Sequence, residues 1–380
     1  MAGSCSKTTV LLILVVSAHA NFLRIEAAAE IGTAAGWVRH KLALLGGATT
    51  TGTGSVDGKG INTAVVAKDG TGNFTTIGQA LEAAPPGRGW YGVFIKAGVY
   101  EETVNISRHS VVLWGEGIGK TIITGRRYSV RQKHTDMPWT ATVTVTGHGF
   151  IAQDLTIQNT AGPLVPASPA LALRSDSNKS LIHRCRLEGH QDTLWAQNNL
   201  QFYLRCDIAG TVDFVFGNAM AVFQECRLLV RRPPGATHNV ITGQGRDSPG
   251  HASGFVFHRC NVTAMDGDNL TGVDTYLGRP WKNHSRVVFM ESYLSSIVNL
   301  TGWVEWDRGH PVPETTKTVE YLEYGNTGPG AKTNHRVNWT GFRVLTAAEA
   351  SRFTVDNFIN GNRWVPSFVN GQQINYTRTV

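Results

Sequence analysis

The sequence has few cysteines, a deficit of acidic residues and, after its first twenty residues, no long apolar run. None of its five cysteines has the close spacing of a zinc-binding pair, and its thirteen histidines form neither an HExxH motif nor a triad. We therefore expect no metal and no other cofactor. No later apolar run could span a bilayer, and no Lys/Arg run is interleaved with aromatic residues. These absences argue against a membrane protein and a nucleic-acid-binding protein.

Acidic residues number 28 against 35 lysines and arginines, which gives a formal net charge of +7. A basic protein concentrates near anionic partners. For a protein outside the cell, an acidic polysaccharide fits better than nucleic acid. General solubility charge is the alternative interpretation.

The N-terminal region has the features of a secretory signal. Lys7 precedes an apolar run, Val10–Val16, and a small-x-small cleavage pattern follows. Gly46–Gly60 is almost entirely Gly, Thr and Ser, as in a flexible linker. We expect a signal peptide at residues 1–20, a flexible spacer at 21–60, and one domain at 61–380.

Asn-x-Ser/Thr sequons are unusually frequent in this chain. Together with a signal peptide they predict a secreted protein that is glycosylated at several positions. The nine sequons start at Asn73, Asn105, Asn178, Asn261, Asn269, Asn283, Asn299, Asn338 and Asn375.

A repeat of variable length runs through the middle of the chain. Short alternating strands such as Phe202–Ile208 are separated by Gly, Asn and Asp turns. Unequal spacing argues against a propeller, whose blades have constant length, and favours a coil with loops of variable length. We predict an all-β parallel solenoid; an ordinary sandwich with chance spacing is the alternative. The matching positions are Leu155/Ile157, Cys185/Leu187, Cys206/Ile208, Cys226/Leu228, Cys260/Val262 and Ser292/Leu294.

Helical segments are predicted as caps near both ends of this solenoid. Thr75–Ala84 has apolar residues at helical spacing and stops before two prolines. Near the C-terminus, Thr346 followed by Glu349 three residues later forms a capping box.

Two aspartates lie at the same phase of the repeat. Asp192 comes seven residues after Cys185, and Asp213 comes seven residues after Cys206. On adjacent coils of a solenoid such positions lie about 4.8 Å apart. Two carboxylates that close acquire different pKa values, which is how one residue type supplies both a nucleophile and a proton donor. Ordinary Asx-turn residues are the alternative.

Four cysteines remain beyond the predicted signal, an even number for an oxidising compartment. Their positions in the repeat allow two interpretations. They are small core residues that stack without bonding, or neighbours form a Cys185–Cys206 or a Cys206–Cys226 disulfide. The sequence does not decide between these.

Several motifs, in order, identify a family resemblance. From Val65 to about Pro366 the chain resembles plant pectin methylesterases, the pectinesterases of cell walls. The matching segments are Asp69-Gly-Thr-Gly-Asn-Phe-Thr-Thr76, Ile95-Lys-Ala-Gly-Val-Tyr100, Gly189-His-Gln-Asp-Thr-Leu194, Gly210-Thr-Val-Asp-Phe-Val-Phe-Gly-Asn218, Tyr276-Leu-Gly-Arg-Pro-Trp-Lys282 and Gly328-Pro-Gly-Ala331.

The resemblance implies a right-handed parallel β-helix that hydrolyses methyl esters of galacturonate residues in pectin and releases methanol. Asp213 would be the nucleophile, and Asp192 the general acid and then the general base. Arg279 would orient the nucleophile, the Gln191 amide would face the oxyanion, and Trp281 would stack on a sugar ring. A surface glutamine, a structural salt bridge and ordinary packing are the respective alternatives for the last three.

The resemblance also implies a secreted, monomeric cell-wall protein whose partners are pectin and a proteinaceous inhibitor. Too few residues lie between the predicted signal and Val65 for the large inhibitor-like pro-region of many relatives. One departure bears on catalysis: Pro169 stands where the family has a second oxyanion glutamine, and proline has no donor. A weakly active or inactive pectin-binding wall protein is therefore one alternative function. Another carbohydrate-active β-helix enzyme, such as a lyase or a polygalacturonase, is the other.

Overall fold

The chain forms two units, and most of the description concerns the larger one, Asn62–Val365 with Asn375–Val380. The structure is a computed structural model that describes residues 62–87, 89–129, 134–162, 168–306, 315–365, 368–369, 372–373 and 376–380. The predicted signal peptide, the predicted spacer and the sequon at Asn375 lie outside these residues. The smaller unit, Met1–Ile61 with Pro366–Ile374, contains the antiparallel pair β27 (Phe368–Val369) and β28 (Gln372–Gln373).

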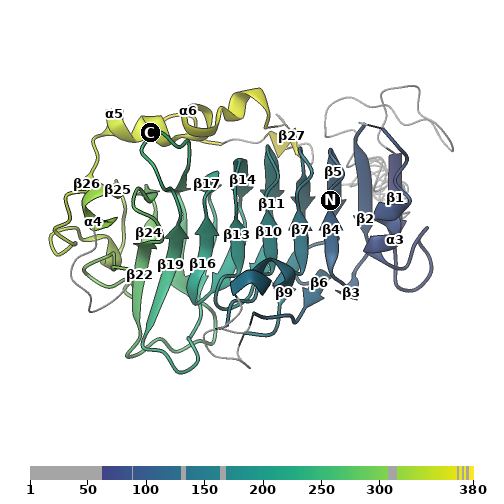
Figure 1. The fold of residues 1–380 in the computed structure, drawn as a ribbon, viewed down its shortest axis with the longest axis horizontal. Helices are drawn as coiled ribbons and strands as arrows, with labels where there is room; N and C mark the ends of the chain where they lie inside the picture. The colour runs from purple at the N-terminus through teal and green to yellow at the C-terminus, as the bar shows by residue number, and fades with distance from the viewer. Residues whose placement is uncertain are drawn as a thin grey trace, which may run out of the picture. The chain divides into compact units, whose positions relative to one another are not determined.

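Strands of the larger unit form three parallel sheets, named A, B and C here (Figure 1). Sheet A contains, in spatial order, β1 (Asn62–Val66), β2 (Tyr91–Ile95), β5 (Val111–Trp114), β8 (Ile151–Gln153), β11 (Ser180–His183), β14 (Leu200–Leu204), β17 (Met220–Gln224), β20 (Gly254–His258), β23 (Arg286–Met290), β25 (Glu320–Tyr324) and β26 (Phe342–Val344).

Sheets B and C take the strands between those of sheet A. Sheet B contains β3 (Gly98–Glu101), β6 (Thr121–Gly125), β9 (Thr156–Asn159), β12 (Arg186–Glu188), β15 (Asp207–Gly210), β18 (Arg227–Val230), β21 (Asn261–Ala264) and β24 (Tyr293–Leu294). Sheet C contains β4 (Val104–Ile106), β7 (Val143–Val145), β10 (Leu173–Ser175), β13 (Leu194–Ala196), β16 (Val212–Gly217), β19 (His238–Gln244) and β22 (Asp274–Pro280). In the middle of the unit the chain visits A, B and C in turn, so the predicted parallel β-helix is confirmed.

The register predicted from the repeat is also confirmed. Leu187 pairs with Ile157 on one side and Ile208 on the other. Leu228 and Val262 continue the same row. Each of these residues points into the core. Residues at the same position of the sequence repeat therefore pair with one another on neighbouring strands.

The corner between sheets A and B is built from left-handed residues that are not glycine. The residue before each cysteine of the repeat has a positive φ, an unusual conformation for a residue with a Cβ. Neighbouring side chains along this corner form ion pairs, including Arg184 with Asp154 at 2.7 Å and Arg205 with Glu225 at 2.8 Å. The corner residues are Asp154, Arg184, Arg205, Glu225, Arg259 and Glu291.

Inward side chains stack on chemically similar neighbours. Tyr203, Phe223, Phe257 and Phe289 form a continuous aromatic stack with ring centroids 4.5, 4.7 and 4.5 Å apart. The four cysteines form a second column; they are buried, and none is bonded to another. They are therefore core residues, and neither disulfide left open by the sequence is present.

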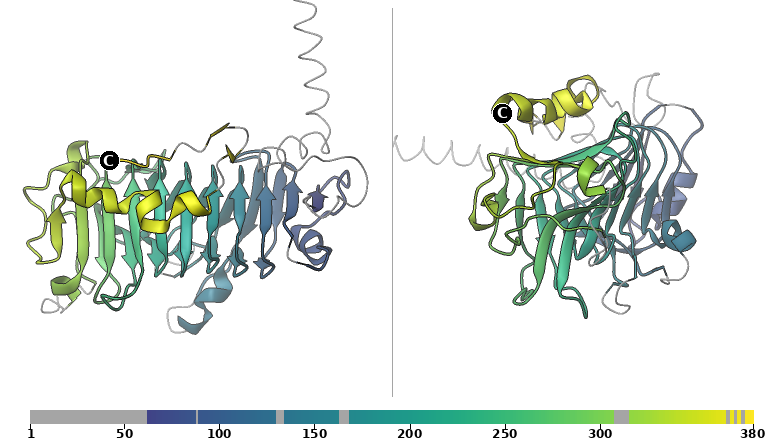
Figure 2. Two further views of the ribbon diagram at one scale, coloured as in Figure 1. Left: turned by 90° about the horizontal axis from the view of Figure 1, so that it is seen from above. Right: turned by 60° about the vertical axis from the view of Figure 1, so that its left-hand side comes forward.

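Short helices lie at the N-terminal end and along sheet A. The predicted N-terminal helix is α3 (Ile77–Glu82), capped by Thr76. The capping box at Thr346 and Glu349 is confirmed at the start of α5 (Ala347–Ala350). The following helix, α6 (Val355–Ile359), packs against β14 and β17 on the outer face of sheet A instead of covering the last strand (Figures 1 and 2). The remaining helices are η1 (His134–Thr140), α4 (Thr315–Thr318), η2 (Pro329–Ala331), η3 (Ser351–Phe353) and η4 (Gly361–Arg363). None of the helices in the described part of the chain is long and apolar enough to cross a membrane.

Candidate active site

Asp192 and Asp213 end two equivalent turns that lead into sheet C. Each follows a glycine by three residues, Gly189 or Gly210, and each has a positive φ, 62° and 49° respectively. A Cβ on either glycine would lie 2.7 Å from the Thr193 hydroxyl, so small residues let the two turns stack closely. The pairing of β16 with β19 shifts by one residue between Val212 and Val215. Asp213 lies within this bulge, and bulges redirect side chains.

The two aspartates lie on adjacent coils. The pairing of β13 with β16 aligns Leu194 with Val215, and Asp192 N–H donates to the Val212 carbonyl at 3.0 Å. Both aspartates are buried, with exposed fractions of 7% for Asp192 and 5% for Asp213. Two carboxylates are thus held side by side at low solvent exposure.

Arg279, on β22, reaches across β19 to Asp213. Its Nε lies 3.0 Å from Oδ1 and its Nη2 lies 2.5 Å from Oδ2, which makes a two-point ion pair. Gly243 is the β19 residue between them, and a Cβ there would lie 3.1 Å from the Asp213 Cγ. The absence of a side chain at Gly243 gives the arginine room to reach the carboxylate.

The two carboxylates have different electrostatic surroundings. Burial raises the pKa of Asp192 well above its ordinary value, the neighbouring Asp213 charge raises it further, and Arg279 acts in the opposite direction. Arg279 donates two hydrogen bonds to Asp213 and stabilises its carboxylate form. The arrangement therefore favours one protonated and one ionised carboxyl, a combination suited to acid–base and nucleophilic chemistry.

Gln191 precedes Asp192 and is partly exposed. Its carbonyl accepts a hydrogen bond from Ala170 N–H at 3.2 Å, and its side-chain amide bonds to no other residue in the described part of the chain. Pro169 comes directly before Ala170, and its own carbonyl accepts from Ser129 N–H at 2.9 Å. The proline thus lies beside the Gln191 backbone, where it offers no donor.

Trp281 is partly buried. Its ring meets Phe216 edge to face at 6.0 Å, and Phe216 stacks on Trp195 at 5.4 Å. A Cβ on Gly245 would lie 2.7 Å from the Trp281 ring, so the indole covers this glycine. The site therefore presents aromatic rings from the coils of β13, β16 and β22, and the intervening coil of β19 contributes glycine.

Sequence reasoning left four aromatic residues in and around this site unassigned. Phe214 is in the central core, whereas Phe216 is in a separate apolar cluster on the outer side of sheet C. Strand alternation separates the two, but which of them faces inward was not decided. Trp306 lies under the Arg279 guanidinium, 4.1 Å from its ring centroid, and no sequence pattern connected these residues. Trp195 directly follows the motif Gly189–Leu194, and this position was the only indication in the sequence that it belongs to the site.

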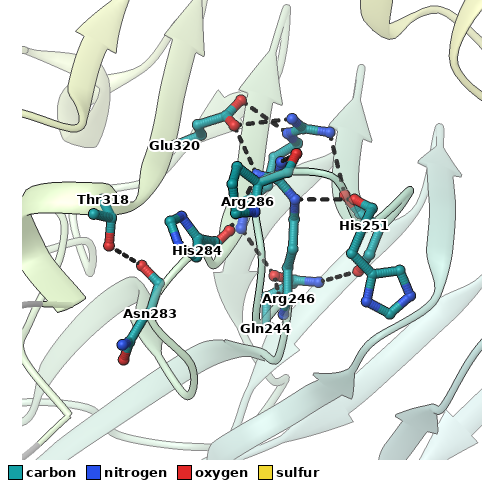
Figure 3. A network of polar contacts seen from close by, with 10 residues as sticks. Gln244, Arg246, His251, Asn283, His284, Arg286, Thr318 and Glu320 are labelled. Atoms are coloured by element: carbon teal, nitrogen blue, oxygen red, sulfur yellow. Dashed lines mark hydrogen bonds and ion pairs between the residues drawn. The ribbon is translucent and has the colours of Figure 1, made fainter.

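Figure 3 shows a network of polar contacts that includes Gln244, Arg246, Arg286 and Glu320. Glu320 accepts hydrogen bonds from Arg246 at 2.7 Å and from Arg286 at 2.9 Å. The Gln244 side-chain oxygen accepts from the backbone N–H groups of the same two arginines at 3.0 and 2.8 Å. Because the Gln244 carbonyl also accepts from Trp281 N–H at 3.2 Å, the network holds the backbone that carries the indole.

His190 is a buried histidine in the turn before Gln191. Burial, and then the charge of Arg231, lower its pKa from 6.5 to about 4. Its ring packs on Gly162, where a Cβ would lie 2.4 Å from the His190 Cβ. The imidazole is therefore neutral through most of the acidic range.

We expect His190→Phe to reduce the loss of stability in acid. The unfolded chain binds a proton at this histidine below pH 6.5, but the folded chain does so only near pH 4. The unfolded state is therefore favoured as the pH falls through this window, by roughly 2–3 kcal/mol at its lower end. Phenylalanine has no such proton. Urea unfolding at neutral pH and near pH 4 gives the change in the free energy of unfolding with pH for the variant and for the wild type. His335→Phe, at an exposed position, controls for the loss of one histidine. An unchanged pH dependence in His190→Phe would contradict the expectation.

Two unlike carboxylates on the outer side of a parallel β-helix, close to several aromatic rings, define a candidate site for acid–base and nucleophilic chemistry. A family model described as Pectinesterase matches residues 63–362. The chain belongs to the pectinesterase family.

Individual relatives agree with this assignment. The chain is 49% identical over 309 residues to "Probable pectinesterase/pectinesterase inhibitor 17" of Arabidopsis thaliana and 47% identical over 307 residues to "Pectinesterase 2" of Citrus sinensis. Each match covers 80% of this chain and 58% of the relative, so the chain spans less than two thirds of the length of these proteins. Among solved structures, the pectin methylesterase from carrot has a TM-score of 0.76 at 38% identity, covering 85% of this chain and 99% of that one.

Proposed function

We propose that this protein is a carboxylic ester hydrolase that removes methyl esters from galacturonate residues of cell-wall pectin and releases methanol. The observation that carries the proposal is the pair of buried aspartates on adjacent coils, of which Asp213, but not Asp192, forms an ion pair with an arginine among the described residues. Family membership and the solved pectin methylesterase in complex with "hexasaccharide VII", at 25% identity and a TM-score of 0.65, support the substrate class.

The proposed roles follow from the different surroundings of the two carboxyl groups. Ionised Asp213, oriented by Arg279, attacks the ester carbonyl and forms an acyl-enzyme. Asp192, protonated in the resting site because of its raised pKa, gives its proton to the departing methoxide. It then takes a proton from the water that hydrolyses the acyl-enzyme.

Gln191 and Trp281 serve binding in this proposal. The Gln191 amide, which has no partner in the described part of the chain, donates to the developing oxyanion. The Trp281 ring supplies an apolar face for a sugar ring. Further parts of the proposal are secretion to the cell wall, action as a monomer, and a proteinaceous inhibitor as a second partner.

The direct test is methanol release from highly methylated pectin by the purified protein, with viscosity followed in parallel. We expect methanol to appear while viscosity does not fall, because ester hydrolysis leaves the polymer chain intact. Shortened or unsaturated products would support a chain-cleaving enzyme instead. Pectin binding without methanol would support a binding protein and refute the proposed activity.

Pro169→Gln is expected to increase kcat. Pro169 precedes Ala170, whose N–H donates to the Gln191 carbonyl. The backbone at position 169 therefore lies next to the residue proposed as the oxyanion donor, and a glutamine side chain there would bring a second amide close to it. One well-placed oxyanion donor contributes at most about 10²–10³-fold in rate. Methanol release at saturating pectin measures the change, and Pro169→Leu, which adds side-chain length without a donor, is the matched control.

Two outcomes would contradict this expectation. An equal gain in Pro169→Leu would show that removing the proline matters and that the amide does not. No gain in Pro169→Gln, with wild-type turnover typical of the family, would show that another donor already fills this role.

A further inference from the structure

The turns that carry Asp192 and Asp213 are hydrogen-bonded directly to each other. Asp192 N–H donates to the Val212 carbonyl at 3.0 Å, and Thr211 N–H donates to the His190 carbonyl at 2.9 Å. Both bonds cross from one coil to the next. The separation of the two carboxyl groups therefore depends on how closely these turns stack.

Thr193 places a buried hydroxyl group between the two turns. Its side chain is fully buried. Its Oγ1 lies 2.9 Å from the Ala209 carbonyl oxygen, on the next coil, and 3.2 Å from the His190 carbonyl oxygen, on its own turn. A hydroxyl group has one proton, so it donates to one of these carbonyls at a time. A Cβ on Gly189 or Gly210 would lie 2.7 Å from the same oxygen, so the two glycine turns close around it.

The size of this hydroxyl group matters for the spacing of the coils. A hydroxyl donor approaches a carbonyl oxygen to about 2.7–2.8 Å, whereas a carbon atom approaches it only to about 3.3–3.6 Å. A methyl group in place of the Thr193 Oγ1 would therefore push the Ala209 carbonyl away by roughly 0.5 Å. Gly210 directly follows Ala209, so the displacement would reach the turn of Asp213.

The same arrangement occurs two coils earlier, outside the candidate site. Thr142 comes directly before β7 and Thr193 directly before β13, and both strands pair with β10 in the same register. The Thr142 hydroxyl donates to the Gln158 carbonyl on the next coil at 2.8 Å, and a Cβ on Gly125 would lie 2.7 Å from its oxygen. A threonine hydroxyl thus joins adjacent coils at both places, and at Thr193 the joined coils carry the two aspartates.

We propose that Thr193 is a positioning residue whose hydroxyl group sets the spacing of the two turns, and with it the separation of the Asp192 and Asp213 carboxyl groups. The proposal rests on the proposed function, because it gives this separation a role in ester hydrolysis. Thr193 carries no charge and acts through geometry.

Thr193→Val tests the proposal, because valine keeps the branched shape and replaces only the hydroxyl group by a methyl group. We expect kcat for methanol release to fall about 10- to 100-fold, since misplacing reacting groups by about 1 Å costs about 10²-fold. KM should stay within about twofold. Thr193→Ser keeps the hydroxyl group and should recover most of kcat. Thr193→Ala removes the hydroxyl group without adding volume, and it gives the same test if the valine variant does not fold.

The pH profile of kcat distinguishes this role from a general loss of structure. Burial, and then the charge of Asp213, raise the pKa of Asp192, while Arg279 lowers it. A wider separation weakens the effect of Asp213, so Asp192 loses its proton at lower pH. Because protonated Asp192 is the proposed general acid, the alkaline limb should move to lower pH in Thr193→Val and not in Thr193→Ser. An alkaline limb that stays in place in Thr193→Val would overturn the proposal.

Thr142→Val is the matched control. It makes the same change in the equivalent hydroxyl group two coils earlier, and it should keep the kcat, KM and pH profile of the wild type. Wild-type kcat in a folded Thr193→Val variant would overturn the proposal, and so would an equal fall in Thr142→Val. Thermal unfolding of each variant establishes that a loss of activity is not a loss of fold.

Amide hydrogen exchange separates this proposal from the proposed function, because it needs no turnover. The amides of Asp192 and Thr211, which bond across the two turns, should exchange about five- to tenfold faster in Thr193→Val than in the wild type. They should exchange at the wild-type rate in Thr142→Val. Unchanged exchange in Thr193→Val would overturn the positioning role, whereas a wild type that releases no methanol would refute the esterase activity alone.

Discussion

Asp213→Asn is expected to slow methanol release by about 10⁴-fold or more, as the loss of a catalytic nucleophile does. The amide is nearly isosteric with the carboxyl group but cannot attack an ester carbonyl and form the acyl-enzyme. The variant should remain folded, since Asp213 lies in a bulge whose backbone pairing does not depend on the side-chain charge. Methanol release under saturating pectin and circular dichroism measure the two properties.

Asp207→Asn provides the matched control for this change. Asp207 is also a buried aspartate, paired with Arg186 at 3.1 Å and Arg227 at 2.5 Å, but it belongs to sheet B. It should lose stability and keep its methanol release. Near wild-type activity in Asp213→Asn, or an equal loss of activity in Asp207→Asn, would refute the proposed role of Asp213.

Arg279→Gln is expected to lower both stability and activity. It leaves the buried Asp213 carboxylate without its two-point partner, and removing one member of a buried ion pair costs about 3–5 kcal/mol. It also removes the positive charge that opposes the raised pKa of Asp192, so the Asp192 carboxyl becomes harder to ionise. Denaturant unfolding measures the first effect, and methanol release, with an expected fall of about 10²-fold or more, measures the second.

A double-mutant cycle makes this prediction more specific. Adding Asp213→Asn to Arg279→Gln removes the unpaired charge, so the double variant should regain most of the lost stability while staying inactive. Arg205→Gln is the control: its ion pair with Glu225 is partly exposed, more so than the Arg279–Asp213 pair, and its loss should cost less than about 1 kcal/mol. Additive stability losses in the cycle would show that the Arg279–Asp213 pair is not energetically coupled.

Much of the coil register was predictable from the sequence because each coil places one small or apolar residue at the same phase. Cys185, Cys206 and Cys226 marked that phase, and the pairings of Leu187, Ile208 and Leu228 follow it. The corners were less predictable. Gly, Asn and Asp turns were expected between the strands, but the corner between sheets A and B uses mainly Arg and Glu, whose positive φ is accompanied by ion pairs between coils.

The candidate site was only partly predictable for a similar reason. The matched motifs contain Asp192, Asp213 and Arg279, and the structure brings these three together. The contacts that complete the site join residues far apart in the chain, such as Arg246 with Glu320, 74 residues away. Loops of unequal length separate such residues, so no local pattern indicates that they meet.

The column of unbonded cysteines makes local unfolding of the central coils measurable by thiol labelling. All four thiols are buried, and burial raises the pKa of Cys185, Cys206 and Cys226 well above the ordinary value. The thiolate is the reactive form of cysteine. In the native coils the thiols are buried and protonated, so alkylating reagents and oxidants do not react with them. The native fold needs no oxidant to form and loses nothing to a reductant. Labelling of these sulfurs therefore counts opening events of the central coils, which makes them built-in probes of local stability beside the aspartate pair.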